Sequence, residues 1–351
     1  MLRRHLSIAA VAIALLASAC GKNSDTKNAA TATTTDAAPV TVRLGYLANL
    51  THATALVGVN KGIYASKLGT DTLTTQTFNA GGDAVTALFS DAIDAAYVGP
   101  NPAINGWAKS NGTALKIISG ATSGGAALVV KPSITKPEQL KGKKLATPQL
   151  GNTQDVALRW WLKGFNFTTD TSGGGDVKIV PQDNGQTLQT FQAGDIDGAW
   201  VPEPWATRLV QEGGGHVLVN EKDLWDTGDF VTTQLIVSQK FLKAHPDAVK
   251  RLLEGQVAAN DYVNAHPTEA QAAANAQLEK LTGKKLSDAV ISAAWKNLRF
   301  TNDPIAASLK LSAKHAQDVA LLQPVNLTGI YDLTLLNQVL TKAGEDKVKA
   351  A

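Results

Sequence analysis

The sequence predicts an α/β protein built from two similar lobes, and a repeated pattern is the main reason. Residues 91–102, DAIDAAYVGPNP, share with residues 194–204, GDIDGAWVPEP, an Asp-containing turn, a buried strand and a Pro-rich loop. The match continues upstream, where residues 78–88 parallel residues 181–191. The repeat distance of roughly 100 residues is too long for a solenoid, whose units have about 20–50 residues. Two lobes that face each other are therefore expected.

Chain length and the order of elements support this fold class. The part of the chain after residue 39 has about 310 residues, which exceeds the usual limit of a single hydrophobic core. Strands alternate with helices through most of it, and that order is typical of mostly parallel sheets.

The first lobe is expected to begin with an alternating strand, VTVRLGY, at residues 40–46. Its further strands are expected at 73–78, 95–98, 115–121 and 127–130, and its helices at 53–64, 82–89 and 100–107. The last of these strands is interpreted as the crossing out of this lobe.

The second lobe is expected to repeat this order. Its strands are placed at 145–148, at the residues just before the turn that follows Pro181, at 196–201 and at 230–237. Its first helix is placed at 155–164. The last strand is interpreted as the return crossing. Lobe 1 is thus assigned residues 40–131 plus 236–351, and lobe 2 residues 132–235.

The sequence pattern predicts helices from residue 239 to the end of the chain. Two His-Pro pairs, at residues 245 and 266, precede acidic first turns, which favour helix starts. Helices are expected at 247–264, 268–281, 287–298, 304–321 and 332–343, packed on lobe 1.

The first 39 residues are expected to lie outside the folded body. Arg3 and Arg4, the apolar run at residues 6–19 and Cys20 resemble a bacterial lipoprotein signal, in which the cysteine is lipidated after cleavage. The alternative is an ordinary signal peptide with a chance cysteine. Residues 21–39 are low in complexity and are expected to form a flexible tether. Because Cys20 is the sole cysteine, disulfides and cysteine catalysis are excluded.

Charge excludes one class of partner. The formal net charge is only +3, and the sequence shows no basic patch and no nucleic-acid-binding motif. Nucleic acid is therefore not an expected partner.

Five strand-to-helix junctions carry the candidate binding residues. Helix N-termini present free N–H groups and partial positive charge. The side chains at these junctions are mostly hydroxyls and amides, which suits a small anion held by neutral donors. The junctions are residues 49–52, 100–102, 123–125, 152–154 and 202–205.

At these junctions the sequence resembles a known family. The segments GYLANLTHATALVGVNKGIY, VGPNPAINGW, LGNTQD and WVPEPWATRLV resemble the substrate-binding proteins of ABC importers for aliphatic sulfonates, nitrate and taurine, a family related to binders of thiamine pyrimidine precursors. The resemblance covers residues 40–345. It implies a periplasmic-binding-protein-like fold with two crossovers, a ligand in the cleft, no cofactor, and delivery to a membrane permease with its ATPase by a lipid-anchored, monomeric protein.

Eight residues are the candidate ligand contacts, and each has a structural alternative. The threonines could only cap helices, Asn101 could only stabilise its turn, and Ser123 could be structural in its glycine loop. Glu203 could pair with the N–H groups of its own helix or bind a ligand amine. Trp205 could belong to the core or cover the alkyl part of a ligand. The full set is Thr51, His52, Asn101, Ser123, Asn152, Thr153, Glu203 and Trp205.

The favoured ligand is an aliphatic sulfonate or a taurine-like compound. Nitrate, bicarbonate and a thiamine pyrimidine precursor remain alternatives, since hydroxyl and amide donors tolerate all of them. A pyrimidine-precursor enzyme that uses His52 and iron is a further alternative, but the sequence lacks H-E-x-x-H, G-x-S-x-G and phosphate-loop motifs. The third functional alternative is an adhesive surface lipoprotein. The paired junctions argue against it, because an adhesive protein does not need two facing helix N-termini. The protein is therefore expected not to be an enzyme and to hold no metal.

Overall fold

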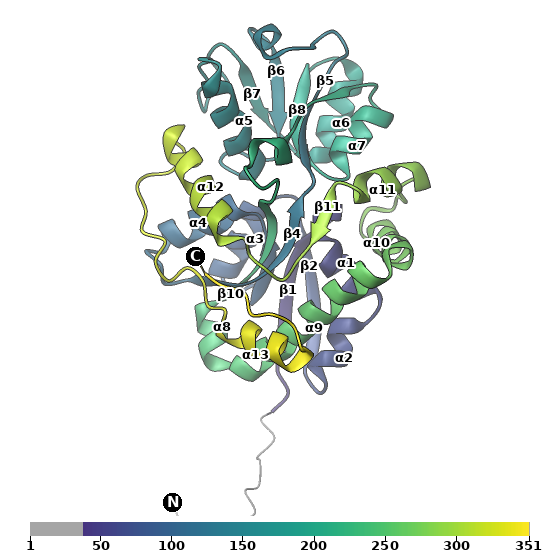
Figure 1. The fold of residues 1–351 in the computed structure, drawn as a ribbon, viewed down its shortest axis with the longest axis vertical. Coiled ribbons are helices and arrows are strands. Elements are labelled where there is room, and N and C mark those ends of the chain that lie inside the picture. The colour runs from purple at the N-terminus through teal and green to yellow at the C-terminus, as the bar shows by residue number, and fades with distance from the viewer. Residues whose placement is uncertain (1–37, 351) are drawn as a thin grey trace, which may run out of the picture. The chain divides into compact units, whose positions relative to one another are not determined.

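The computed structural model describes residues 38–350, in which two α/β lobes each surround one sheet (Figure 1). The sheet of the first lobe has six strands. Their order across the sheet is β11 (Leu298–Phe300), β4 (Leu115–Gly124), β10 (Val231–Ser238), β3 (Ala95–Val98), β1 (Thr41–Leu47) and β2 (Thr72–Phe78).

The sheet of the second lobe has five strands. Their order is β7 (Lys178–Pro181), β6 (Lys144–Thr147), β8 (Gly198–Pro202), β5 (Ala126–Val130) and β9 (His216–Asn220). In Figure 1 this sheet lies in the upper half of the picture, above that of the first lobe.

The two sheets contain the same four-strand unit. In the first, β1 pairs in parallel with β2 and β3, and β3 pairs antiparallel with β10. In the second, β6 pairs in parallel with β7 and β8, and β8 pairs antiparallel with β5. The sequence repeat thus corresponds to a repeated topology, as expected.

Helices connect the parallel strands in both lobes. Most of them start just after a strand end, and α4 begins with Pro100, whose fixed φ angle suits the first helical position. In the first lobe these helices are α1 (Ala53–Asn60), α2 (Ile63–Leu68), α3 (Gly81–Phe89) and α4 (Pro100–Lys109). In the second they are α5 (Thr153–Gly164), α6 (Asn184–Ala193) and α7 (Trp205–Gln211).

The chain crosses between the lobes at other residues than expected. Strand β5 was assigned to lobe 1, but it pairs with β8 and β9 in the second sheet. Residues 231–235 were assigned to lobe 2, but they pair with β3 and β4 in the first sheet. The first crossing is at Gly124 and Gly125, whose φ angles of 79° and 77° suit glycine. The Gly124 N–H donates to Phe230 O at 3.3 Å, so the two crossings lie side by side.

The C-terminal helices agree with the predicted ones to within a few residues at most ends. They are α9 (Pro246–Ala265), α10 (Pro267–Thr282), α11 (Asp288–Trp295), α12 (Ala306–Asp318) and α13 (Thr334–Ala343). Helix α8 (Gln239–Ala244) precedes them and was not among the predicted helix ranges. One of these helices ends earlier than expected. The helix predicted at 287–298 ends at Trp295, and residues 298–300 form strand β11, paired with the end of β4. Strand β9 was not predicted at all.

The C-terminal extension also contacts the second lobe, where only packing on lobe 1 was expected. The imidazole of His315 in α12 stacks on Trp160 of α5, with ring centroids 3.7 Å apart. Gln211 Nε2 of α7 donates to Ala289 O of α11 at 3.5 Å. Figure 1 shows α11 and α12 at the level where the two lobes meet. The C-terminal extension therefore packs against both lobes.

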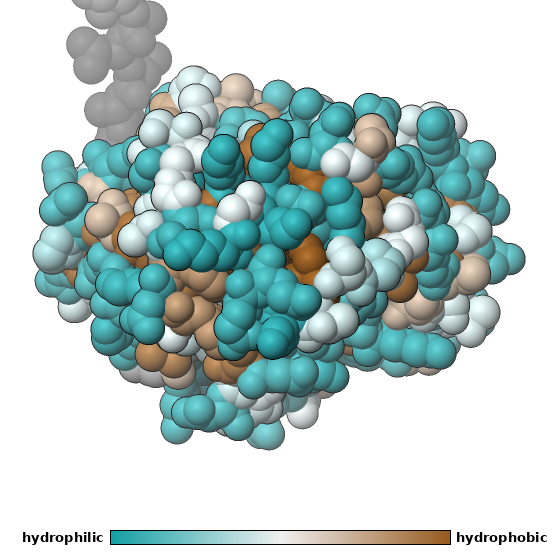
Figure 2. Space-filling model, turned by 90° about the horizontal axis from the view of Figure 1, so that it is seen from above, coloured by the Kyte–Doolittle hydropathy of each residue, from teal (hydrophilic) through white to brown (hydrophobic). Residues whose placement is uncertain are grey.

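The surface offers no large apolar area on the face seen in Figure 2. Hydrophilic residues cover most of that face, and hydrophobic residues form small, separate areas. Among the described residues, the large apolar side chains that are most exposed are Phe89, Leu150, Phe165, Val217 and Leu311. Scattered residues of this kind are ordinary on a soluble surface.

The signal and tether predictions fall outside the described part, apart from residues 38 and 39. Within residues 38–350, no helix has the length and apolar character to cross a membrane.

Glu221 is a buried carboxyl group in the core of the second lobe, and it makes the stability of the fold depend on pH. Glu221 Oε2 accepts a hydrogen bond of 2.7 Å from Trp200 Nε1, and both side chains are buried. Burial raises the pKa of Glu221 to about 7. An acid with a raised pKa in the folded state stabilises the fold at low pH, and this contribution is lost as the pH rises.

Glu221→Gln should therefore stabilise the protein at pH 8 relative to the parent. The amide keeps an acceptor for Trp200 but does not ionise, and a shift of this size corresponds to about 3 kcal/mol. Urea unfolding between pH 4.5 and pH 8.5 should show the variant gaining on the parent from about pH 4.5, the ordinary pKa of a glutamate, up to about pH 7, with no further gain above that pH. Subtracting the two profiles cancels the other titrating groups. A difference that is constant with pH would contradict the prediction.

Candidate functional site

A small cavity of about 30 Å³ lies where the two lobes meet, at the carboxyl ends of their strands. Each of four strands contributes a lining residue at or just beyond its end, namely Leu47 of β1, Gly99 after β3, Pro148 after β6 and Pro202 of β8. The repeated strands that end near Val98 and Val201 thus reach the same cavity. This is the edge at which open α/β sheets bind ligands.

Four helices begin at this cavity, two from each lobe. Lining residues come from the starts of α3 and α4 in the first lobe and of α5 and α6 in the second. The first four N–H groups of a helix have no partner within it, and the N-terminus carries partial positive charge. The contributing residues are Asn79, Ala80, Gly81, Gly99, Pro102, Asn152, Thr153, Gln154 and Asn184. The cavity is thus suited to negative charge.

His52 adds a neutral donor to the cavity. Its side chain is 3% exposed, and burial lowers its pKa to about 3. Nδ1 accepts a hydrogen bond of 3.3 Å from the backbone N–H of Leu47. A neutral imidazole that accepts at Nδ1 carries its proton at Nε2. His52 therefore lines the cavity as a hydrogen-bond donor and not as a cation.

The cavity wall contains no formal charge. Of the described residues that line it, none is Asp, Glu, Lys or Arg. The nearby carboxylate of Asp155 is buried and engaged by Thr147, the Gly151 N–H and Arg159. Asn152 Oδ1 accepts from the Asp155 N–H at 3.0 Å, which caps α5. Attraction for a ligand therefore rests on backbone dipoles and neutral side chains.

Direct hydrogen bonds hold the lobes together around the cavity. Those nearest to it join the loop after β1 to the loop after β8. The Leu50 N–H donates to Glu203 O at 3.0 Å, and Trp205 Nε1 donates to Asn49 Oδ1 at 2.8 Å. Others join Asn79 to Asp183, Gln149 to Gly82 and Asp83, and Asn105 to Gly151. The lobes are thus closed on each other in this structure.

Four of the eight candidate residues line the cavity, and four do not. Those that do are Thr51, His52, Asn152 and Thr153. They come from the first strand-to-helix junction of each lobe. The other four lie close by, but each is engaged elsewhere.

Asn101 and Ser123 serve structural contacts. Asn101 is buried in the first turn of α4, and its Nδ2 donates to Ser312 O of α12 at 3.3 Å. Ser123 lies at the first crossing, where Oγ accepts from the Phe230 N–H and donates to Asp229 Oδ1, both at 3.2 Å. Ser123 therefore joins the two crossing segments, which is why it does not face the cavity.

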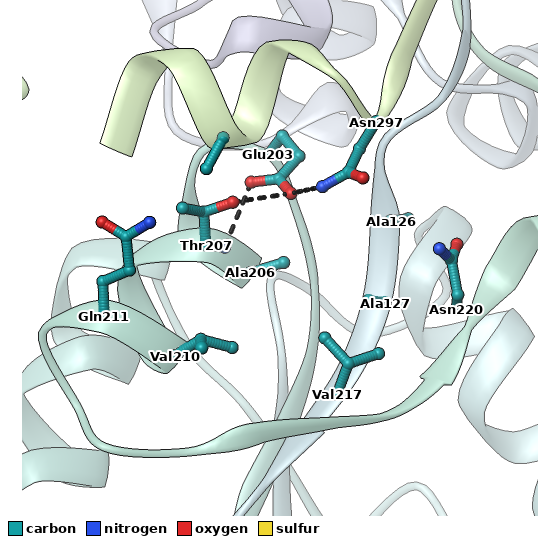
Figure 3. Close-up of a pocket in the computed structure, with 11 residues that line it drawn as sticks. Ala126, Ala127, Glu203, Ala206, Thr207, Val210, Gln211, Val217, Asn220 and Asn297 are labelled. Atoms are coloured by element: carbon teal, nitrogen blue, oxygen red, sulfur yellow. Dashed lines mark hydrogen bonds between the residues drawn. The ribbon is translucent and has the colours of Figure 1, made fainter. Parts of the chain in front are cut away.

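Glu203 faces a different pocket, as Figure 3 shows. Its carboxylate accepts from Thr207 N at 3.1 Å and from Thr207 Oγ1 at 2.9 Å, which caps α7. Asn297 Nδ2 donates to it at 2.7 Å from the C-terminal extension. The side chain is 2% exposed, and burial raises its pKa. The structural alternative for Glu203, pairing with its own helix, is the observed arrangement.

Trp205 does not line the cavity either. Its indole lies in a neighbouring groove, with the Arg208 guanidinium 4.7 Å from the ring centroid. Only its hydrogen bond to Asn49 connects it to the cavity wall.

Several lining residues were missed from sequence. Asn79 and Gly81 precede or begin α3, and Asn184 begins α6. Gly81 and Asn184 occupy equivalent positions in the repeat, so the repeat itself contained the signal. Gln154 and Thr232 also line the cavity.

A family model described as the NMT1-like family matches residues 35–278 of the chain. The taurine-binding periplasmic protein of Escherichia coli (strain K12) is 28% identical over 190 residues, which are 54% of this chain and 57% of that protein. The matched part thus spans just over half the length of that relative.

Solved structures share the fold. The alkanesulfonate-binding protein SsuA from Xanthomonas axonopodis pv. citri aligns with a TM-score of 0.66 and 18% identity over 82% of this chain and 96% of its own. The nitrate-binding protein NrtA from Synechocystis PCC 6803 aligns with a TM-score of 0.69 and 15% identity over 87% and 89%. The expected periplasmic-binding-protein fold is thereby confirmed. Since the family model covers more than half of the chain, the protein belongs to the NMT1-like family.

Proposed function

We propose that the protein is the solute-binding component of an ABC importer and captures a small organic sulfonate in the cavity between its lobes. The observation that carries this proposal is the meeting of four helix N-termini at a cavity with no charged side chain in its wall. Helix N-termini bind sulfate, phosphate and carboxylate groups in this way. The taurine-, alkanesulfonate- and nitrate-binding relatives support an oxyanion.

Closure of the lobes completes the site. The starts of α3 and α4 belong to one lobe and those of α5 and α6 to the other, so all four surround the ligand only in the closed state. When the lobes separate, half of the donors leave the anion. Neutral donors allow this release, because no full ionic bond has to be broken. A monomer of this kind can deliver its ligand to a membrane permease with its ATPase.

The cavity wall favours a simple sulfonate over a taurine-like compound. An ammonium group is stabilised by a carboxylate partner, and no described lining residue supplies one. The volume of about 30 Å³ accommodates only a small head group in the closed state, since one water needs about 10–15 Å³. Nitrate and bicarbonate fit the same donors and remain competing ligands.

The arrangement supports binding rather than catalysis. A histidine that ligates iron needs an unprotonated ring nitrogen directed at the metal. In His52 the unprotonated Nδ1 is engaged by Leu47, which leaves a protonated Nε2. We therefore do not assign the protein to the pyrimidine-precursor enzymes.

Isothermal titration of the purified chain tests the proposal. The ligands are methanesulfonate, taurine, nitrate, bicarbonate and an aminopyrimidine, with sodium chloride as the control for ionic strength. We expect saturable 1:1 binding of methanesulfonate, and weaker binding of taurine. Binding of the aminopyrimidine with none of any oxyanion would overturn the proposal.

The same proposal includes a lipid anchor at Cys20, which lies outside the described residues. Cys20→Ala should move the protein from the membrane fraction to the soluble fraction of an expressing bacterium, because no thiol remains for lipid attachment. Immunoblots of both fractions, with and without detergent, give the measurement. If the parent is soluble, or the variant stays in the membrane fraction, the anchor assignment is wrong.

A further inference from the structure

A second, larger pocket lies next to the cavity. We call it the outer groove. Its volume is about 470 Å³, and it lies between the start of α7, helix α6 and the segment that follows α10. Its wall includes Leu188, Trp205, Arg208, Leu278, Lys284 and Leu286. Lys284 and its neighbour Lys285, which also lines the groove, are exposed, so the groove opens to solvent.

Only one layer of residues separates the outer groove from the cavity. Asn49 lines the cavity, and its neighbour Ala48 lines the groove. At the start of α6, Asn184 lines the cavity and Gly185 the groove. The two pockets are thus adjacent along two separate segments of chain.

The indole of Trp205 lies against this layer, on the side of the groove. Its Nε1 donates to Asn49 Oδ1 at 2.8 Å, which holds the ring against the first lobe. On the other side, a Cβ atom at Gly185 would lie 3.8 Å from Cη2 of the ring. Trp205 therefore bridges the two segments that separate the pockets.

The chemistry of the outer groove suits the tail of an organic anion. Leu188, Leu278 and Leu286 supply apolar surface. Arg208 is paired with Glu212 at 2.9 Å, whereas neither Lys284 nor Lys285 has a carboxylate within 4.0 Å among the described residues. The groove thus combines apolar walls with an excess of positive charge, and positive charge raises the local concentration of anions.

We infer that Trp205 is the residue that limits the length of the ligand. This inference rests on the proposed function. With the indole in place, the cavity takes an oxyanion with a short substituent. With the indole removed, cavity and groove become continuous, and an alkyl tail extends along the leucines. The sequence alone suggested the opposite, that Trp205 covers the alkyl part of the ligand, because the partition between the pockets was not visible in it.

The test compares methanesulfonate with hexanesulfonate by isothermal titration. The parent should bind methanesulfonate more tightly than hexanesulfonate by at least about tenfold. Trp205→Ala should bind hexanesulfonate at least about tenfold more tightly than the parent does, since each buried methylene contributes about fourfold in affinity. Its affinity for methanesulfonate should fall by less than that factor.

Trp205→Phe is the matched control. It removes the hydrogen bond to Asn49 but keeps an aromatic ring in the partition, so it should keep the selectivity of the parent. If Trp205→Ala does not fold by circular dichroism, Trp205→Leu replaces it with the same expectation. An unchanged ratio of the two affinities in the alanine or leucine variant would overturn the inference. Failure of the parent to bind either sulfonate would instead overturn the proposed function.

Discussion

Thr153→Asp should weaken sulfonate binding by about a thousandfold while leaving the fold intact. Thr153 is buried, lines the cavity and is the first residue of α5. A carboxylate there meets a bound anion at about 4 Å, and two like charges at that distance repel by about 4 kcal/mol at an effective dielectric constant of 20. The helix itself favours an acid in its first turn by about 0.3–1 kcal/mol. Titration calorimetry and a thermal melt measure the two effects separately.

Thr153→Asn is the matched control, because its amide has the shape of the carboxylate without the charge. It should weaken binding by no more than about tenfold, the cost of one altered hydrogen bond. Equal losses in the two variants would mean that size and not charge is responsible. Tighter sulfonate binding by Thr153→Asp would contradict the placement of the anion at the start of α5.

The part of the site that could be predicted follows from local rules. Thr51, His52, Asn152 and Thr153 directly follow the first strand of each lobe, and chain direction alone places them at the carboxyl edge of a sheet. No tertiary information is needed for that step. The repeated unit likewise indicated which strand ends meet.

The candidate residues that do not line the cavity are held by long-range contacts. Ser123 is held by Asp229 and Phe230, and Asn101 by Ser312, each more than 100 residues away. Such partners decide where a side chain points, and spacing along the sequence does not reveal them. Trp205 shows the same limit, because its place depends on Asn49 of the other lobe.

The strands that were missed are edge strands. Strand β11 has three residues and exists because Leu298–Phe300 pair with residues 122–124 of β4. Strand β9 pairs only with β5 and is half-buried. Edge strands have weak patterns because one side lacks a partner. The crossing at Gly124 and Gly125 was displaced for a related reason, since an apolar run such as β5 fits either sheet.

Gly99→Ala should weaken sulfonate binding by about 5- to 150-fold through a clash between the lobes. Gly99 caps α4 in the first lobe with φ −71° and ψ 170°, which alanine adopts without strain. A Cβ atom there would lie 2.3 Å from Thr153 Oγ1 and 3.4 Å from Thr153 Cβ, across the closed cleft. Overpacking of this kind costs about 1–3 kcal/mol. The cost is paid only when the lobes close, so the melting temperature without ligand should change little.

Two further variants isolate the cause. Gly82→Ala also places a Cβ atom against the other lobe, 2.5 Å from Gln149 Oε1, but that atom ends a flexible side chain that can move away. It should bind within about threefold of the parent, below the loss that overpacking by 1 kcal/mol would cause. In Gly99→Ala/Thr153→Ala the clashing hydroxyl is gone, so the double variant should bind more tightly than the two single losses predict when added. Strict additivity would show that Gly99 and Thr153 do not meet on closure, and that binding does not bring these two helix starts together.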